Sequence, residues 1–185
     1  MSKDKLGKTK LCVDAGTAKT GLREFEENDL SKNLQNKTIN DCLIVKYEEC
    51  DNVVRSESGT KDCIVFLGIT SCLAMIIDAG DSGYVFGHVV EYSDGVSGQD
   101  DNIKSVLKKI SDKYELVPTN FNKIWLFDYE GAWESSVNAS IACGADKTFI
   151  DLKQENVDIV VAMGDSIKYV IHDRKNNTLG SEIQL

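Results

Sequence analysis

One cysteine and one histidine stand at a spacing that could support acyl-transfer chemistry. Cys72 opens an apolar run after the polar turn 68–71, and His88 lies 16 residues later in the next apolar run. An imidazole beside a thiol can accept its proton and so generate the nucleophilic thiolate. The imidazolium can then return the proton to a leaving amine. We therefore predict Cys72 as a nucleophile and His88 as its general base and acid.

The geometry of this pair depends on the hairpin between the two residues. A hairpin centred on Gly80 places Cys72, eight residues earlier, directly opposite His88, eight residues later. The same register pairs Ala74 with Phe86. Directly opposed side chains share one face of a sheet, with Cβ atoms about 4.5–5.5 Å apart. A slip of one residue would put the thiol and the imidazole on opposite faces.

The turn before Cys72 offers hydrogen-bond donors for a developing oxyanion. Gly68, Thr70 and Ser71 are the candidates, through backbone N–H groups together with that of Cys72, or through the two hydroxyls. Gly87 directly precedes the histidine and leaves room for a substrate backbone to approach. These parts suit attack on an amide carbonyl.

The elements that must hold these residues are mostly short strands. Runs of β-branched or aromatic residues bounded by Gly, Ser and Asp predict strands. They cover residues 42–47, 63–67, 73–78, 84–92, 123–129, 147–152, 158–163 and 167–172. Because most of them follow one another in hairpin order, the sequence predicts an α+β fold, an antiparallel β-sandwich-like core flanked by outer helices.

Two helices interrupt this series. Ile103, Val106, Leu107 and Ile110 share one helical face after Asp100 or Asp101, either of which could be the N-cap. A second helix is expected through Trp133, Val137 and Ile141, with Gly144 at the C-cap position. We take Trp125 and Trp133 as core residues.

The N-terminal part differs in composition from the rest. Residues 1–40 are polar and lack steady periodicity, so we expect an N-terminal segment with a short strand near 11–13 and a short helix within 21–33. Residues 41–185 are expected to form a single catalytic domain. His172 is expected to be a partly exposed strand residue.

Composition limits the partners and the cofactors. The net charge of −9 and the lack of a Lys/Arg cluster disfavour nucleic acid and anionic membranes. No phosphate-binding glycine motif is present, and the two histidines and scattered cysteines favour no metal site, so we expect no cofactor. No export signal or spanning segment is visible, which favours reduced thiols. We expect a cytoplasmic protein, or one delivered into a host cell without a cleavable signal.

The motif around Cys72 resembles a known family. The string LGITSC, followed by the GH of residues 87–88, resembles the Cys-His core of the glutamine deamidases. These are the chemotaxis receptor glutamine deamidases and the toxin catalytic domains of the cytotoxic necrotizing factor and lethal-factor types. The arrangement is also similar to protein N-terminal asparagine amidohydrolase. The resemblance implies a β-sandwich-like core with outer helices, with Cys72 as nucleophile and His88 as base and acid.

The chain departs from the family motif in two places. Ile69 and Thr70 lengthen the GSC string to GITSC, and Phe66 stands where several relatives carry a threonine. The group that orients His88 is therefore open between Thr60, Thr70 and a backbone carbonyl. The resemblance covers about residues 60–95.

The expected function is a cysteine-dependent protein glutamine deamidase, a hydrolase acting on a protein substrate. A bacterial effector or toxin that acts on a host protein fits this expectation, as does a housekeeping enzyme. Two alternatives stay open. One is a non-catalytic acidic binding or adaptor module, and the other is a different Cys-His acyl transfer, such as that of a transglutaminase, an N-terminal asparagine amidohydrolase or a protease. The sequence does not indicate an oligomeric state.

Overall fold

The structure is a computed structural model of residues 1–185. Backbone and side chains are described for residues 42–45, 63–91, 98–142, 144–163, 166–176 and 178–185, and the backbone alone for 9–11, 14–15, 18–19, 23–25, 50–53 and 96–97. The chain divides into two compact units. Unit 1 comprises residues 1–44, 61–68 and 156–185, and unit 2 comprises residues 45–60 and 69–155.

The larger sheet lies mostly in unit 1. Its strands are β5 (Leu43–Val45), β7 (Cys63–Ile69), β12 (Val157–Ala162), β13 (Lys168–Asp173), β14 (Thr178–Leu179) and β15 (Ile183–Gln184). The order is β14-β13-β12-β7-β5, and β15 also pairs with β13. The β12–β13, β13–β14 and β13–β15 ladders are antiparallel. A core cluster that includes Val65, Val160 and Val170 lies in this unit.

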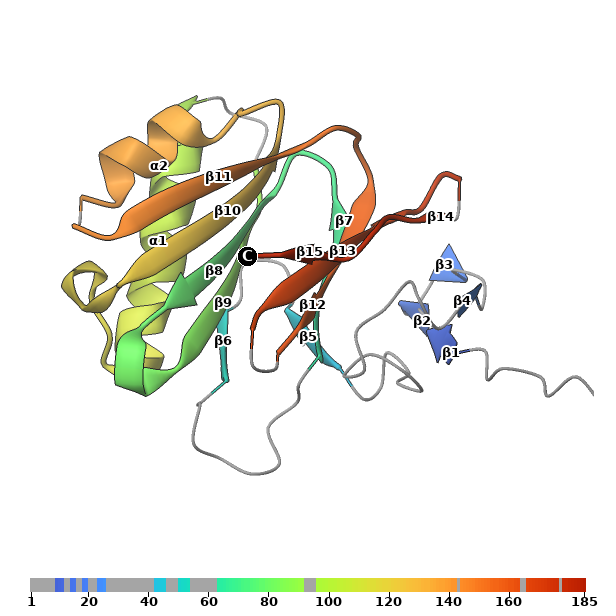
Figure 1. The fold of residues 1–185 in the computed structure, drawn as a ribbon. Helices are drawn as coiled ribbons and strands as arrows, with labels where there is room; N and C mark the ends of the chain where they lie inside the picture. The colour runs from blue at the N-terminus through green and yellow to red at the C-terminus, as the bar shows by residue number, and fades with distance from the viewer. Residues whose placement is uncertain are drawn as a thin grey trace, which may run out of the picture. The chain divides into compact units, whose positions relative to one another are not determined.

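Unit 2 carries the second sheet and both helices of the described chain (Figure 1). The elements are β6 (Cys50–Val53), β8 (Leu73–Asp78), β9 (Tyr84–Val89), β10 (Lys123–Tyr129), β11 (Asp146–Leu152), α1 (Val96–Tyr114) and α2 (Glu134–Ser140). The strand order is β11-β10-β8-β9-β6. All pairs are antiparallel except β10–β11, which are parallel because α2 crosses between them.

The helices cover one face of the unit 2 sheet. The apolar residues on that face of β8, β9 and β10 form one core with Ile103, Val106 and Ile110 of α1 and Val137 of α2. Residues of the opposite face, such as Ala74, Phe86 and Phe127, are also fully buried. The expected α+β class, with mostly antiparallel sheets and outer helices, is confirmed.

Four short strands lie in the N-terminal part. They are β1 (Thr9–Leu11), β2 (Asp14–Ala15), β3 (Ala18–Lys19) and β4 (Arg23–Phe25). The β1–β4 and β2–β3 pairs are antiparallel. The helix expected within 21–33 is therefore wrong at β4, where backbone pairing with β1 replaces it, and the rest of that range lies outside the described residues. No helix in the described part of the chain is long and apolar enough to cross a membrane.

Both helix boundaries differ from those expected. Helix α1 begins at Val96, so Asp100 and Asp101 lie inside it and do not cap it. Helix α2 ends at Ser140 with Ile141 as its C-cap residue, so Gly144 lies beyond the cap. The apolar spacing identified the buried helix faces, whereas the polar residues near the ends did not mark where hydrogen bonding starts and stops.

The hairpin between β8 and β9 has a register two residues from the expected one. Ala74 pairs with His88 and Ile76 with Phe86, so Cys72 is not directly opposite His88. The connection contains a 3₁₀ turn, Gly80–Ser82, which moves its centre beyond Gly80. The shift is an even number of residues, so His88 shares a face with Ala74, and the shared face of Cys72, which lies before β8, stays a prediction.

Candidate functional site

Cys72 lies at the edge of the unit 2 sheet, directly before β8. The residue is 7% exposed, whereas Thr70 and Ser71 in the turn before it are exposed. The backbone N–H groups of Thr70 and Glu91 donate hydrogen bonds to its sulfur. Burial raises the pKa of the Cys72 thiol, and the negative charge of Glu91 adds to this, while the two N–H donors oppose it. The pKa is raised overall, so the thiol form is favoured at rest.

His88 lies on β9 and is almost fully buried. The side chain is 1% exposed, and its Nδ1 lies 3.3 Å from the carbonyl oxygen of Val45. Burial lowers the pKa of His88 to about 4, and the hydrogen bond to the Val45 carbonyl opposes this only in part. A neutral ring that donates from Nδ1 to Val45 carries its lone pair on Nε2, the nitrogen a general base needs.

The contact with the carbonyl of Val45 indicates a group that orients the His88 ring. One of the three candidates, a backbone carbonyl, is bonded to the imidazole. The side chain of Thr70 is exposed, and Thr60 lies outside the described residues. The sequence carries no signal for this contact, because any residue type can supply a carbonyl.

Cys72 lies one residue before the β8–β9 ladder, and continuing the ladder by that residue would make it a diagonal neighbour of His88. His88 pairs with Ala74, which is two residues from Cys72 along the same strand direction. Residues two apart on a strand face the same side, and diagonal neighbours are about 7–8 Å apart at the backbone, within reach of an aromatic-sized ring. Catalytic hydrogen bonds are often longer before a substrate binds than in the complex.

Two bonds fix the ends of the turn before Cys72. The N–H of Gly68, which has a φ of 65°, donates to Oδ1 of Asp158 at 2.9 Å. Nε1 of Trp133 donates to the carbonyl oxygen of Ser71 at 2.8 Å. The amide of Gly68 is therefore engaged by a carboxylate and that of Thr70 by the sulfur of Cys72, so the oxyanion candidates in this turn are the N–H groups of Ser71 and Cys72 and the hydroxyls of Thr70 and Ser71.

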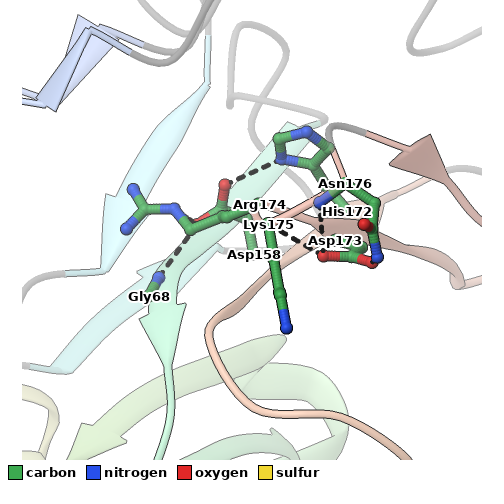
Figure 2. A network of polar contacts seen from close by, with 7 residues as sticks. All are labelled: Gly68, Asp158, His172, Asp173, Arg174, Lys175 and Asn176. Carbon is green, nitrogen blue, oxygen red and sulfur yellow. Dashed lines mark hydrogen bonds and ion pairs between the residues drawn. The ribbon is translucent and has the colours of Figure 1, made fainter.

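Asp158 is the centre of a buried polar network in unit 1. Figure 2 shows its carboxylate between Gly68, His172 and Arg174. Oδ2 of Asp158 lies 3.0 Å from Nδ1 of His172, and Oδ1 lies 2.8 Å from Nε of Arg174. His172 is 4% exposed, so the expectation of a partly exposed residue is wrong. The bond to Asp158 compensates for the burial of its polar ring.

A second buried carboxylate holds Trp133. Oδ2 of Asp128 accepts a hydrogen bond from the backbone N–H of Trp133 at 2.9 Å. Asp128 is fully buried, and no hydrogen-bond partner for its Oδ1 is found in the described part of the chain. Burial raises the pKa of Asp128, and the charges of Asp151 and Glu134 add to this effect. Both tryptophans are buried, as expected.

Gly87 does not open a path for a substrate. A Cβ at this position would lie 3.0 Å from Cε of Met75 and 3.1 Å from Cγ1 of Val106. The glycine instead lets α1 approach β9 closely, so its interpretation as room for a substrate backbone is wrong. Because Gly87 and His88 are adjacent on β9, they face opposite sides of the sheet, and Gly87 lies on the side that the helices cover.

The prediction of reduced thiols is wrong for two of the cysteines other than Cys72. Cys42 and Cys63 form a disulfide between the neighbouring strands β5 and β7, where their Cα atoms are 4.6 Å apart. The expected reduced thiols are therefore wrong for this pair, because strand pairing brings the two residues together. Cys72 is a buried free thiol. The side chains of Cys12, Cys50 and Cys143 lie outside the described residues.

No family model matches the sequence, and no curated protein matches it. Solved structures with similarity include the C-terminal domain of CNFy from Yersinia pseudotuberculosis, with a TM-score of 0.38 and 8% sequence identity. The similarity covers 82% of this chain and 65% of that chain, less than two thirds of the latter.

Proposed function

We propose that the protein is a cysteine-dependent glutamine deamidase that acts on a protein substrate. The observation that carries this proposal is that Cys72 lies directly before β8, two residues from Ala74, which pairs with His88, and that Nδ1 of His88 is bonded to the carbonyl of Val45. That bond leaves Nε2 as the basic nitrogen. The resemblance of the LGITSC segment to the Cys-His deamidases supports the choice of substrate class.

The reaction starts from a neutral pair. The sulfur of Cys72 attacks the side-chain carboxamide carbon of a glutamine while Nε2 of His88 takes the thiol proton. Backbone N–H groups of Ser71 and Cys72 stabilise the oxyanion. His88 returns the proton to the nitrogen, the C–N bond breaks and ammonia leaves. Water then attacks the thioester with His88 as base, which releases glutamate and restores the thiol.

The neutral pair is compatible with this route, because the proton moves during attack rather than before it. A pKa of about 4 keeps His88 unprotonated at neutral pH. The same burial makes the imidazolium a strong acid towards the leaving nitrogen once it forms. The N–H groups of Thr70 and Glu91 stabilise negative charge on the sulfur as it develops and as the thioester breaks down.

The test is a deamidation assay with position-specific variants. Wild-type protein, Cys72→Ser and His88→Asn are incubated with a cell lysate in water enriched in heavy oxygen, and converted glutamines are identified by mass spectrometry. The label distinguishes enzymatic hydrolysis from conversion before the assay. We expect labelled glutamate with the wild type and a loss of at least about a hundredfold in both variants. Labelled conversion that persists in Cys72→Ser would contradict the assignment.

A second candidate function is a non-catalytic acidic binding module. The raised pKa of Cys72 favours it, because a thiol that stays protonated at neutral pH is a poor nucleophile at rest. The net charge of −9 would then favour a basic partner. This candidate predicts that Cys72→Ser leaves binding of the folded protein to a basic partner unchanged.

A further inference from the structure

The peptide that leads into Cys72 is bonded to a tryptophan from a distant part of the chain. Nε1 of Trp133 donates a hydrogen bond to the carbonyl oxygen of Ser71 at 2.8 Å, across a sequence separation of 62 residues. Both residues belong to unit 2. Trp133 is fully buried, whereas Ser71 is exposed. The indole therefore ties an exposed turn to the buried core of the same unit.

The carbonyl of Ser71 and the N–H of Cys72 belong to one peptide group. This peptide group is trans, so it is planar and its C=O and N–H point in opposite directions. A hydrogen bond that holds the carbonyl therefore also sets the direction of the N–H, which points away from the indole. A bonded carbonyl polarises its peptide group and makes the N–H a stronger donor. The contact thus acts on one of the oxyanion candidates.

Trp133 and His88 are on different sides of the unit 2 sheet. Trp133 belongs to the core cluster that the sheet forms with its helices. Gly87 faces that same side, because a Cβ on it would meet Val106 of α1. His88 is the next residue on β9 and faces the opposite side. The indole therefore approaches the turn from the core that the helices cover, and the candidate base lies on the other side.

The position of Trp133 is itself fixed by the connection that follows β10. Oδ2 of the fully buried Asp128 accepts a hydrogen bond from the backbone N–H of Trp133 at 2.9 Å. Between them the chain passes through Glu130, with a φ of 54°, and Gly131, with a φ of 69°. A glutamate adopts this left-handed conformation only where its surroundings define it, and its N–H donates to Oδ1 of Asp151 at 3.2 Å. A buried carboxylate and a strained residue thus hold one indole in place.

We propose that Trp133 is a positioning residue for the oxyanion donor of the deamidation. Its indole N–H holds the carbonyl of Ser71 on the side of the helix-covered core, so that the N–H of Cys72 is presented on the side of His88. Trp133 acts through this peptide group rather than on the reacting atoms. The inference rests on the proposed function, because it concerns the oxyanion site of that reaction. Removal of the indole N–H is expected to slow attack on a carboxamide and to leave the reactivity of the sulfur unchanged.

The first experiment observes the peptide group directly. Ser71–Cys72 is the only Ser-Cys dipeptide in the sequence, so serine labelled with heavy carbon at the carbonyl and cysteine labelled with heavy nitrogen give one peak in a carbonyl–amide NMR correlation. Trp133→benzothienylalanine keeps the ring shape and replaces the N–H by sulfur. We expect the carbonyl carbon of Ser71 to move upfield, because hydrogen bonding deshields a carbonyl carbon. Trp125→benzothienylalanine is the matched control and should leave the peak in place.

The second experiment separates attack on a carbonyl from the reactivity of the thiol. The lysate assay in heavy-oxygen water measures glutamate formation, which requires an oxyanion, and alkylation by iodoacetamide passes through none. We expect Trp133→benzothienylalanine to lower glutamate formation at least about tenfold and to change alkylation of Cys72 by less than about twofold. Trp133→Phe, which removes the N–H and some volume, should show the same separation.

The outcomes distinguish this inference from the proposed function. A Ser71 peak that stays in place, or equal glutamate formation in the wild type and the Trp133 variants, overturns the positioning role of the indole. A loss of glutamate formation and of alkylation by the same factor reports a general structural effect and also overturns it. A wild type that forms no labelled glutamate overturns the proposed function, and the role of Trp133 with it.

Discussion

Burial, rather than a charged neighbour, sets the protonation of His88. Its pKa of about 4 lies below the ordinary value of 6.5, so between these values the unfolded chain binds a proton that the folded chain does not. Stability contributed by the neutral ring is therefore complete above about pH 6.5 and is lost as the pH falls towards 4. The shift corresponds to about 3 kcal/mol.

We expect this loss to disappear in His88→Gln, which does not titrate. Urea unfolding of the wild type and the variant at several pH values between 7 and 4 gives the difference in unfolding free energy. That difference should change by about 3 kcal/mol across the range in favour of the variant. A difference that does not depend on pH would show that the buried ring is not the titrating group.

Asp128 is a carboxylate whose pKa is raised by burial, in contrast to the lowered pKa of His88. Because its pKa is raised, the ionised group destabilises the fold at neutral pH, and this cost vanishes below the ordinary carboxyl pKa of 3.8. We expect Asp128→Asn, which retains an oxygen for the N–H of Trp133, to raise the urea midpoint at pH 7 and to lose this gain in acid. Asp81→Asn in the exposed turn is the control. A lower midpoint at pH 7 would contradict the prediction.

The candidate catalytic residues are predictions from residue type and spacing, whereas their environment is defined only by the fold. Cys72 and His88 are predicted because a thiol and an imidazole flank one hairpin. Their pKa directions depend on burial, which only the folded chain defines. The contact of Val45 with His88 has no local signal in the sequence, since it is made through the backbone carbonyl.

Among the elements, strands were predicted well because most are fully apolar and bounded by turn residues. Strands β8 and β10 begin and end where the sequence pattern does. The register of the β8–β9 hairpin was not predictable from loop length alone, because the 3₁₀ turn Gly80–Ser82 takes up residues that a symmetric loop would pair. The shift is an even number of residues, so Ala74 and His88 face the same side, which is compatible with the predicted shared face of Cys72 and His88.

The contact between β9 and α1 gives a prediction at this scale. Gly87→Ala would place a methyl group 3.0 Å from Met75 and 3.1 Å from Val106, so α1 would have to shift or the side chains repack. We expect a loss of about 1–3 kcal/mol in unfolding free energy. Gly144→Ala, which meets nothing within 4 Å, should change it by less than about 0.5 kcal/mol. Equal effects of the two substitutions would mean that the close approach is not required.

At the scale of the whole molecule, each of the two units has its own hydrophobic core and its own covalent or polar contacts. Unit 1 contains the Cys42–Cys63 disulfide and the network around Asp158, and unit 2 contains the hairpin with Cys72 and His88. Disulfides persist in oxidising environments. Among the cysteines whose side chains the structure describes, Cys42 and Cys63 link two strands, and Cys72 is the free thiol on which the proposed chemistry depends.

The disulfide should contribute to stability mainly by restricting the unfolded chain. The bridge closes a loop with a sequence separation of 21 residues, for which the loss of chain entropy corresponds to about 3 kcal/mol. We expect a reductant to lower the unfolding free energy of the wild type by about this amount and to have no effect on Cys42→Ser/Cys63→Ser. Peptide mapping of the native protein without reductant should recover the two cysteines in one linked pair. If a thiol reagent labels both of them in the folded protein without reductant, the strands are held by backbone pairing and packing alone.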